Sequence, residues 1–126
     1  MNKETSIQNA ILLALSQAGC TVWRNETAGA WVGRVIHKDS GGTVTLANTR
    51  MFKAGLCTGS SDIIGITPDG RFLAVEVKTS LGRLSSEQKR FITAVNRAGG
   101  VAGVARSQQE ALSLIFNSTN QVIPNE

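Results

Sequence analysis

Apolar residues recur at helical spacing near the start of the chain. Ile7, Ile11 and Leu15 fall on one side of a helix with about 3.6 residues per turn, and Gly19 follows as a stop signal. The spacing predicts an amphipathic helix over residues 4–18. Such a helix covers one face of a β-sheet, so the pattern indicates a layered fold.

Strand-like alternation follows this helix. The segment CTVWRN at residues 20–25 alternates and is rich in β-forming residues, which predicts a first strand. Two further β-like runs, WVGRVIHK and TVTLAN, flank the turn sequence DSGG and predict a hairpin inserted at residues 30–48. The following segment, NTRMFKAGLCTGSS, shows no clear period, so we expect an irregular connection with glycines there.

The clearest pattern lies at residues 60–80. Two apolar segments, DIIGIT and RFLAVEVKT, are separated by PDG, a sequence typical of a tight hairpin turn. The register that this turn favours places Asp62 directly opposite Glu76, with Lys78 one step further on the same face. Apart from this end, both faces of the hairpin are apolar, which is typical of strands covered by helices on both sides.

Helix signals return after this hairpin. Ser85 and Gln88 have the spacing of a capping box, and the apolar stripe behind them ends at a pair of glycines. The segment VAGVARS at 101–107 predicts a short strand, and Ser107 with Glu110 forms a second capping pair. The order strand, helix, strand predicts a right-handed parallel crossover.

These elements predict one α/β domain. We expect a mixed central β-sheet flanked by helices, with the hairpin as an insertion, over residues 1–116 and a polar tail at residues 117–126. A chain of 126 residues is long enough to bury a single core.

Composition narrows the classes of function. The 13 lysines and arginines outnumber the 9 acidic residues, and the net charge of +4 favours a polyanionic partner such as nucleic acid. Two cysteines and one histidine cannot form a tetrahedral zinc site within one chain. Since the longest apolar run, residues 10–15, is too short for a signal sequence or a membrane span, we expect an intracellular (cytoplasmic) protein with no membrane partner. We also expect no organic cofactor.

The charged end of the 60–80 hairpin is the candidate site. Two facing carboxylates, Asp62 and Glu76, repel each other unless a cation lies between them, and a hard divalent cation with oxygen ligands is the usual solution. We therefore expect Mg²⁺ or Mn²⁺, with the Val77 carbonyl as a further ligand. Lys78 would orient the attacking water and stabilise charge on phosphorus. The alternative, an ordinary cross-strand salt bridge, leaves one lysine to neutralise two carboxylates.

The motif SSD, thirteen residues, then EVK resembles the core of the PD-(D/E)XK nuclease superfamily, with Ser61 where the motif often has proline. The segments WRNETAG, GLCTGSSDIIGI, EVKTSLGRLSSEQKRFI and AGGVAGVARS are similar to the virus-type replication-repair nuclease (VRR-NUC) domain in its stand-alone phage form. The similarity extends over nearly the whole chain, from Glu4 to Phe116.

The resemblance implies a metal-dependent endonuclease acting on DNA, with Asp62, Glu76 and Lys78 as its catalytic triad. Glu4 matches an acidic residue of the first helix that joins the metal site, and Gln88 matches a helix glutamine beside the lysine. Stand-alone members resemble junction-resolving homodimers. This likeness implies a homodimer that cuts branched DNA such as a four-way junction, in DNA repair or in a phage-infected host.

Other interpretations stay open. The protein is alternatively a non-catalytic nucleic-acid-binding module on a nuclease fold, or a nicking or restriction-like nuclease. Glu4 has a simpler role as a favourable charge at a helix N-terminus, and Gln88 as part of its capping box. We expect His37 on the surface of the inserted hairpin, and Trp23 and Trp31 in core and loop packing.

Phosphate contacts are expected from basic residues that flank the site along the chain, because such contacts position DNA without reading its sequence. These residues are Arg50, Lys53, Arg83 and Lys89.

Overall fold

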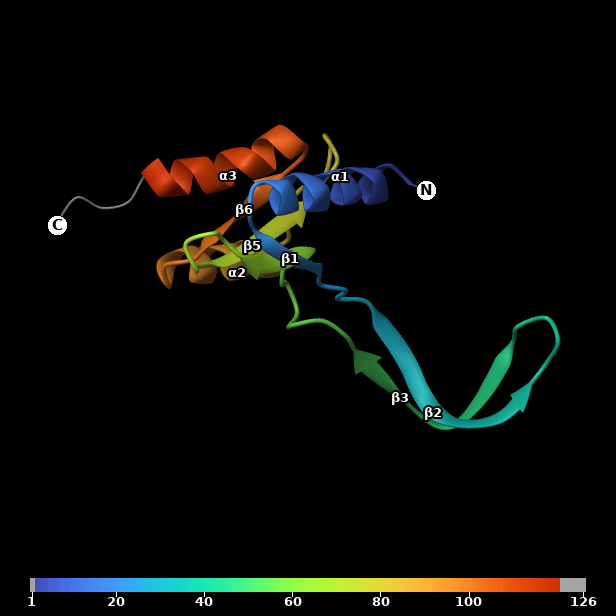
Figure 1. Cartoon of the computed structure of the whole chain (residues 1–126). Helices are drawn as coiled ribbons and strands as arrows, with labels where there is room; N and C mark the ends of the chain where they lie inside the picture. Colours follow the sequence, from blue (N-terminus) through green and yellow to red (C-terminus); the bar gives the residue numbers. More distant parts are fainter. Residues whose placement is uncertain (1, 121–126) are drawn as a thin grey trace.

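The body of the protein is a β-sheet with helices on both faces, and a long hairpin extends from it (Figure 1). The computed structural model describes residues 2–120, and the side chains of residues 2–117. The elements in chain order are α1 (Lys3–Gln17), β1 (Thr21–Arg24), β2 (Gly29–Lys38), β3 (Val44–Lys53), β4 (Ile63–Ile66), β5 (Phe72–Val77), α2 (Ser86–Arg97), β6 (Val101–Ala105) and α3 (Gln108–Asn120).

The central sheet is mixed, as the sequence predicts. Its four strands lie in the order β1-β4-β5-β6. Strand β4 is antiparallel to both of its neighbours, β1 and β5, whereas β5 and β6 are parallel and are connected through α2. The predicted α/β fold with a parallel strand, helix, strand crossover is therefore confirmed.

The β4–β5 hairpin has the predicted register. Ile63 lies opposite Val75, and the Thr67 N–H donates to the Arg71 carbonyl at 2.9 Å. Gly70 closes the turn with φ of +86°, a left-handed conformation that glycine adopts without strain. Because side chains alternate along a strand, this register determines which residues reach each face of the sheet.

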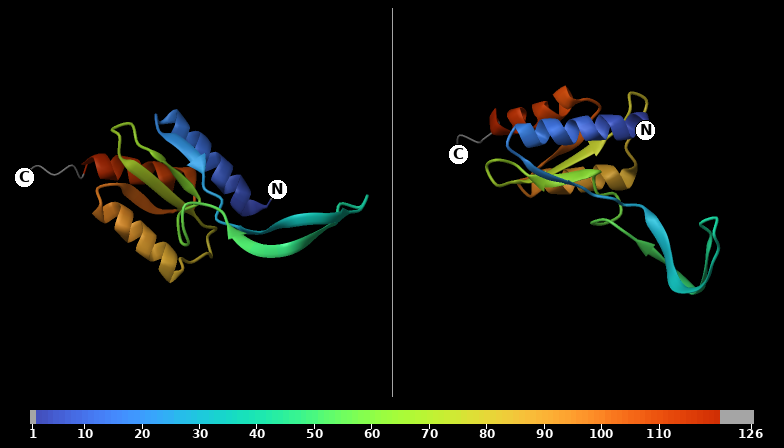
Figure 2. Two further views of the ribbon diagram at one scale, coloured as in Figure 1. Left: turned by 90° about the horizontal axis from the view of Figure 1, so that it is seen from below. Right: turned by 45° about the vertical axis from the view of Figure 1, so that its right-hand side comes forward.

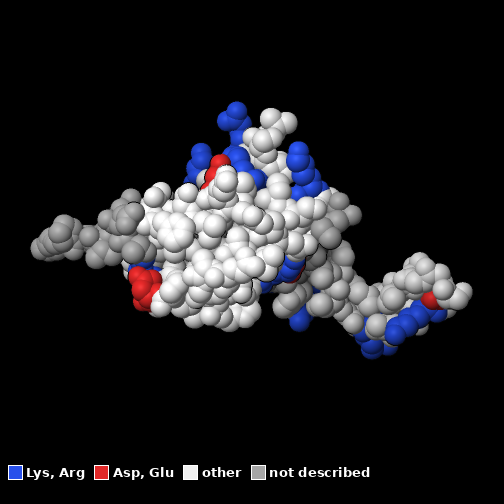
Figure 3. Space-filling model, turned by 45° about the horizontal axis from the view of Figure 1, so that its top comes forward, with Lys and Arg blue, Asp and Glu red and all other residues white. Residues whose placement is uncertain are grey.

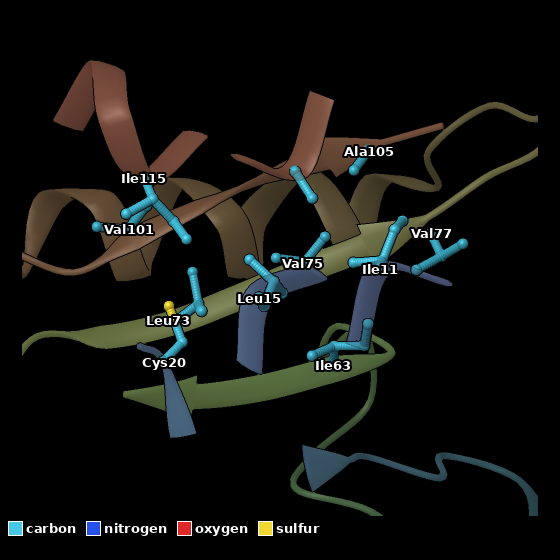
Figure 4. Packing of buried hydrophobic residues seen from close by; sticks show 11 residues of the cluster. Ile11, Leu15, Cys20, Ile63, Leu73, Val75, Val77, Val101, Ala105 and Ile115 are labelled. Atoms are coloured by element: carbon cyan, nitrogen blue, oxygen red, sulfur yellow. The ribbon is translucent and has the colours of Figure 1, made fainter. Parts of the chain in front are cut away.

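One face of the sheet carries the hydrophobic core. Ile11 and Leu15 of α1 are fully buried and pack with Leu73, Val75 and Val77 of β5 (Figure 4). Helix α3 covers the β6 side of the same face and also packs on α1. Each buried aliphatic side chain of this kind contributes about 1.5–3 kcal/mol to stability.

The opposite face is only half covered. Helix α2, opened by the predicted Ser85 capping box, packs on β5 and β6. The Asn96 amide binds both the N–H and the carbonyl of Ala102 on β6, at 2.8 and 2.9 Å. Trp23 lies on the edge strand β1, beyond the reach of α2, and is 52% exposed. The prediction that Trp23 packs in the core is therefore wrong.

Strands β2 and β3 form a two-stranded arm, residues 29–53, that projects away from the body (Figures 1 and 2). The arm is longer than the predicted 30–48 hairpin, because β3 continues to Lys53 through residues expected to be irregular. Its register shifts between Val32 and Arg34 and between Val35 and His37. These bulges interrupt the two-residue alternation of side chains, so the full length of β3 is not predictable from the sequence pattern.

Two residues of the arm test the sequence predictions. His37 is exposed on the surface of the arm, as expected. Trp31 is 62% exposed, so its predicted role in loop packing is wrong. A two-stranded ribbon has no layer above or below it, and an aromatic side chain on such a ribbon stays in solvent.

The C-terminal helix differs from the prediction in two details. Helix α3 continues to Asn120, so residues 117–120 of the expected tail are helical, and residues 121–126 lie outside the described part of the chain. The Ser107 hydroxyl accepts a hydrogen bond from the Glu110 N–H at 3.1 Å, as in a capping box, but the Glu110 carboxylate accepts from the Arg106 N–H at 2.7 Å. Within residues 2–120, no helix combines the length and apolar character needed to cross a bilayer.

Candidate active site

Two carboxylates face each other where β4 begins and β5 ends. Asp62 precedes Ile63, the first residue of β4, and the register continued by one position places Asp62 opposite Glu76. The Val77 N–H donates to Asp62 Oδ2 at 2.8 Å. The Asp62 side chain thus replaces a strand partner at the end of the ladder, and this hydrogen bond holds it beside Glu76. Val77, the last residue of β5, carries the carbonyl predicted as a further ligand.

Glu76 is a charged residue whose side chain is almost completely buried. Its exposed fraction is only 3%, and its Oε1 atom is buried without a hydrogen-bond partner. Burial, and then the negative charge of Asp62, raise the pKa of Glu76 to about 7, although Lys78 acts in the opposite direction. Without a further cation, this carboxylate therefore exchanges its proton near neutral pH.

Gln88 connects the start of α2 to this carboxylate. Its Oε1 atom accepts from the Ser85 N–H at 2.9 Å, while its own N–H donates to Ser85 Oγ at 3.1 Å. Its Nε2 atom donates to Glu76 Oε2 at 2.9 Å. The capping box fixes the orientation of the amide, so the structural role of Gln88 also positions it against Glu76.

Lys78 supplies one positive charge. Its Nζ atom lies 3.4 Å from Glu76 Oε2, and its side chain is 18% exposed. The loop after β5 packs on the stem of Lys78, since a Cβ added at Gly82 would lie 3.1 Å from Lys78 Cδ. Arg106 Nη2 donates to the Gly82 carbonyl at 2.7 Å and ties this loop to the end of β6. Arg106 therefore supports the lysine, a role that sequence analysis missed.

Asn25 organises the segment that delivers Asp62. Its exposed fraction is 8%, and its N–H donates to the Asp62 carbonyl at 2.8 Å. Its Nδ2 donates to Ser60 Oγ at 2.7 Å and to the Ser61 carbonyl at 2.8 Å, while its Oδ1 accepts from the Leu56 N–H at 3.0 Å. One side chain thus fixes a loop that is distant in sequence. The only feature of the sequence that indicates this role of Asn25 is its position as a polar residue directly after an apolar strand.

Glu4 is not gathered with the other acidic residues. It is exposed in the first turn of α1, and residues 2–120 contain no group of three His, Cys, Asp or Glu side chains close enough to hold a metal ion. The physical reason is that α1 packs on the face of Val75 and Val77, whereas Glu76 reaches the opposite face.

The four residues expected to contact phosphates fall into two groups. All four are exposed. Two lie on β3 in the arm, and two lie on the body, one before α2 and one within it. The arm residues are Arg50 and Lys53, and the body residues are Arg83 and Lys89.

The donor set fits a hard divalent cation. Two carboxylates converge, one carboxylate oxygen is buried without a partner, and one lysine leaves the pair with excess negative charge. Oxygen ligands with unneutralised charge are those that Mg²⁺ and Mn²⁺ prefer. Asp62 and Glu76 are therefore the residues that could hold such an ion.

The fold and this site define a class of protein. A mixed sheet flanked by helices, with aspartate on one strand end and glutamate and lysine on the next, is the arrangement of PD-(D/E)XK-type nucleases. The VRR-NUC domain model matches residues 2–109, and the chain belongs to the VRR-NUC family. The predicted family and fold are confirmed, and the protein is a nuclease that acts on DNA. Among curated proteins, none matches the chain.

We predict that Asn25→Ala destabilises the protein by about 2–3 kcal/mol, because it leaves the Leu56 N–H and the Ser61 carbonyl without their partner. Urea unfolding measures this change. The control is Gln109→Ala, which removes an exposed amide from the surface of α3. Equal stability of the two variants would show that the Asn25 network does not hold the loop.

We predict that the metal-free protein loses stability as pH rises from about 5 to 8. Glu76 has its ordinary pKa of 4.5 when unfolded and a pKa of about 7 when folded. Between these values the folded state holds more protons, so the free energy of unfolding decreases with rising pH. Urea unfolding in EDTA measures this dependence, and Glu76→Gln should flatten it. The same pH dependence in both proteins would contradict the assignment.

Proposed function

We propose that this nuclease is a Mg²⁺- or Mn²⁺-dependent endonuclease that cuts branched DNA such as four-way junctions. The observation that carries the metal dependence is the buried Glu76 carboxylate, which faces Asp62 and has one unpaired oxygen. A purely structural ion pair gains nothing from a second carboxylate at short distance, because the added repulsion is destabilising. A divalent cation removes this repulsion.

Each residue of the site has a distinct role in this proposal. Asp62, Glu76 and the Val77 carbonyl would hold the cation, which supplies Lewis-acid stabilisation of charge on the phosphate. Lys78 orients the attacking water and stabilises the same charge. Gln88 positions Glu76 through its hydrogen bond to Oε2. Gln88 belongs to α2 and its amide is fixed by the capping box, so the orientation of Glu76 does not require bound DNA.

Glu4 is proposed as an additional acidic residue of the site. It lies seven residues before Ile11, and so on the same side of α1. Figure 4 shows Ile11 beside Val77 and Leu15 further back along β5, so the start of α1 points toward the charged end of that strand. This direction supports an outer position for Glu4, at the margin of the site.

Basic residues on the body are proposed to hold the DNA phosphates near the cleaved bond. Arg83 lies in the loop that covers Lys78, and Lys89 is in the first turns of α2. Both side chains are exposed and follow the site directly along the chain. Arg50 and Lys53 of the arm are proposed as further phosphate contacts.

We predict that Glu76→Gln and Lys78→Met each slow cleavage of a labelled four-way junction by at least about a hundredfold, because the first weakens the proposed cation site and the second removes the positive charge beside the reacting phosphate. The wild type should cut only with Mg²⁺ or Mn²⁺ present. The control Glu26→Gln removes an exposed carboxylate outside the site and should leave cleavage unchanged.

The same assay includes flaps and plain duplex. Wild-type rates in both site variants would refute the assigned residues. Binding of all three substrates without any metal-dependent product would instead identify a non-catalytic binding module. Equal cleavage of duplex and junction would identify a nicking or restriction-like nuclease.

A homodimer is also proposed, with one strand of the junction cut by each subunit. The half-covered face of the sheet supports it, because Trp23 of β1 and Ile66 of β4 lie on its uncovered part and Phe72 of β5 lies at the border beside α2; the three are 52%, 44% and 40% exposed. Exposed apolar groups of this size commonly mark a contact with another protein surface. Light scattering should give twice the monomer mass, and Trp23→Ser with Phe72→Ser should reduce it. A monomeric wild type would refute the homodimer.

A further inference from the structure

Most of the net positive charge of the protein lies in the arm. The arm holds 25 of the 126 residues, yet its net charge is +3 of the total +4. Figure 3 shows basic side chains along the projecting arm beside a small acidic area. The acidic residue is Asp39, and the basic residues are Arg34, Lys38, Arg50 and Lys53.

These four cations have no acidic partner within residues 2–120. The ion pairs in that part of the chain join Arg71 to Asp69 and Lys78 to Glu76. Asp39 accepts hydrogen bonds from Gly41 and Thr43 N–H groups, both at 2.9 Å, and so stabilises the turn at the tip. Unpaired cations on an exposed ribbon are available to phosphates, and their binding releases the counterions of the nucleic acid.

The register divides the arm into two unlike faces. Arg50 lies opposite Val32, and Arg34 lies opposite Ala47 on the same face, together with His37. The other face is largely apolar over its middle, where Trp31 pairs with Met51 and Val35 pairs with Leu46. One face therefore presents two guanidinium groups in a row, which suits successive phosphates of a strand.

The dimensions of the arm match those of duplex DNA. Each strand has ten residues, so at roughly 3.3 Å per residue the length along the bent ribbon is about 33 Å, close to one helical turn of B-DNA (Figures 1 and 2). A two-stranded ribbon also fits the width of the major groove. The bulges increase the twist of the ribbon, as a surface that follows a helical duplex requires.

The arm leaves the body beside the candidate site. Asn25, four residues before β2, bonds directly to Asp62, and β3 ends nine residues before Asp62. DNA that enters the site is therefore close to the base of the arm.

We propose that the arm binds the duplex segment that flanks the cleaved bond, with Arg34 and Arg50 on its phosphates. This inference rests on the proposed function for the position of the cleaved bond. The contacts are to phosphates, so the arm adds affinity and orientation for any sequence. The arm is bent, so it extends the footprint of the enzyme beyond the cleavage site by at most about one helical turn (Figures 1 and 2).

The test is the salt dependence of DNA binding by the full chain in EDTA, measured by fluorescence polarisation of a labelled 24-bp duplex. Each lost phosphate contact lowers the slope of log affinity against log salt by about 0.9. We therefore expect Arg34→Gln with Arg50→Gln to lower the slope by about two and to weaken binding at low salt. The matched control, Arg71→Gln with Arg97→Gln, removes the same charge from the body, at the β4–β5 turn and the end of α2, and should keep the wild-type slope.

The possible outcomes distinguish a failure of the proposal for the arm from a failure of the proposed catalytic function. An unchanged slope in the arm variant, or an equal loss in the control, overturns the proposal. It is also overturned if Trp31→Ser with Met51→Ser dissociates a dimer while the arginine variant binds normally, because the arm is then a contact between copies. Since EDTA prevents cleavage, a reduced slope supports the arm even if the wild type cuts no substrate.

Discussion

The close approach of two carboxylates, Asp62 and Glu76, is the constraint on which the site depends. Burial makes their repulsion more costly than it is in water. The fold sustains it because each carboxylate is held by a group that cannot move freely: the Val77 backbone N–H for Asp62, and an amide fixed in a helix cap for Glu76. The geometry that favours a cation is thus built into the sheet register and does not depend on flexible surface charges.

The two strands that carry these carboxylates are supported differently. Strand β5 is central, and its Val75 and Val77 are fully buried under α1. Asp62 stands at the end of a loop that a buried asparagine and two serines hold by polar contacts. The glutamate side of the site is therefore stabilised by hydrophobic packing, and the aspartate side by a network of buried hydrogen bonds.

Much of this arrangement is predictable from the sequence, because it depends on local patterns. The PDG turn specifies the β4–β5 register, and the capping box specifies where α2 begins. What the sequence does not reveal are contacts between distant segments, such as Asn25 with Ser61 and Arg106 with Gly82. The full length of the arm was hidden because bulges break its period, and Trp23 was misplaced because α2 leaves the edge strand uncovered.

The attachment of the arm has a mechanical consequence. Its β3 end continues into the loop that carries Asp62, and its β2 end follows Asn25, whose N–H donates to the Asp62 carbonyl, whereas Glu76 belongs to the central strand β5. A force on the arm therefore acts on the segment that carries Asp62 and not on the strand that carries Glu76. Bending of the ribbon would therefore change the separation of the two carboxylates without disturbing the packing of the core.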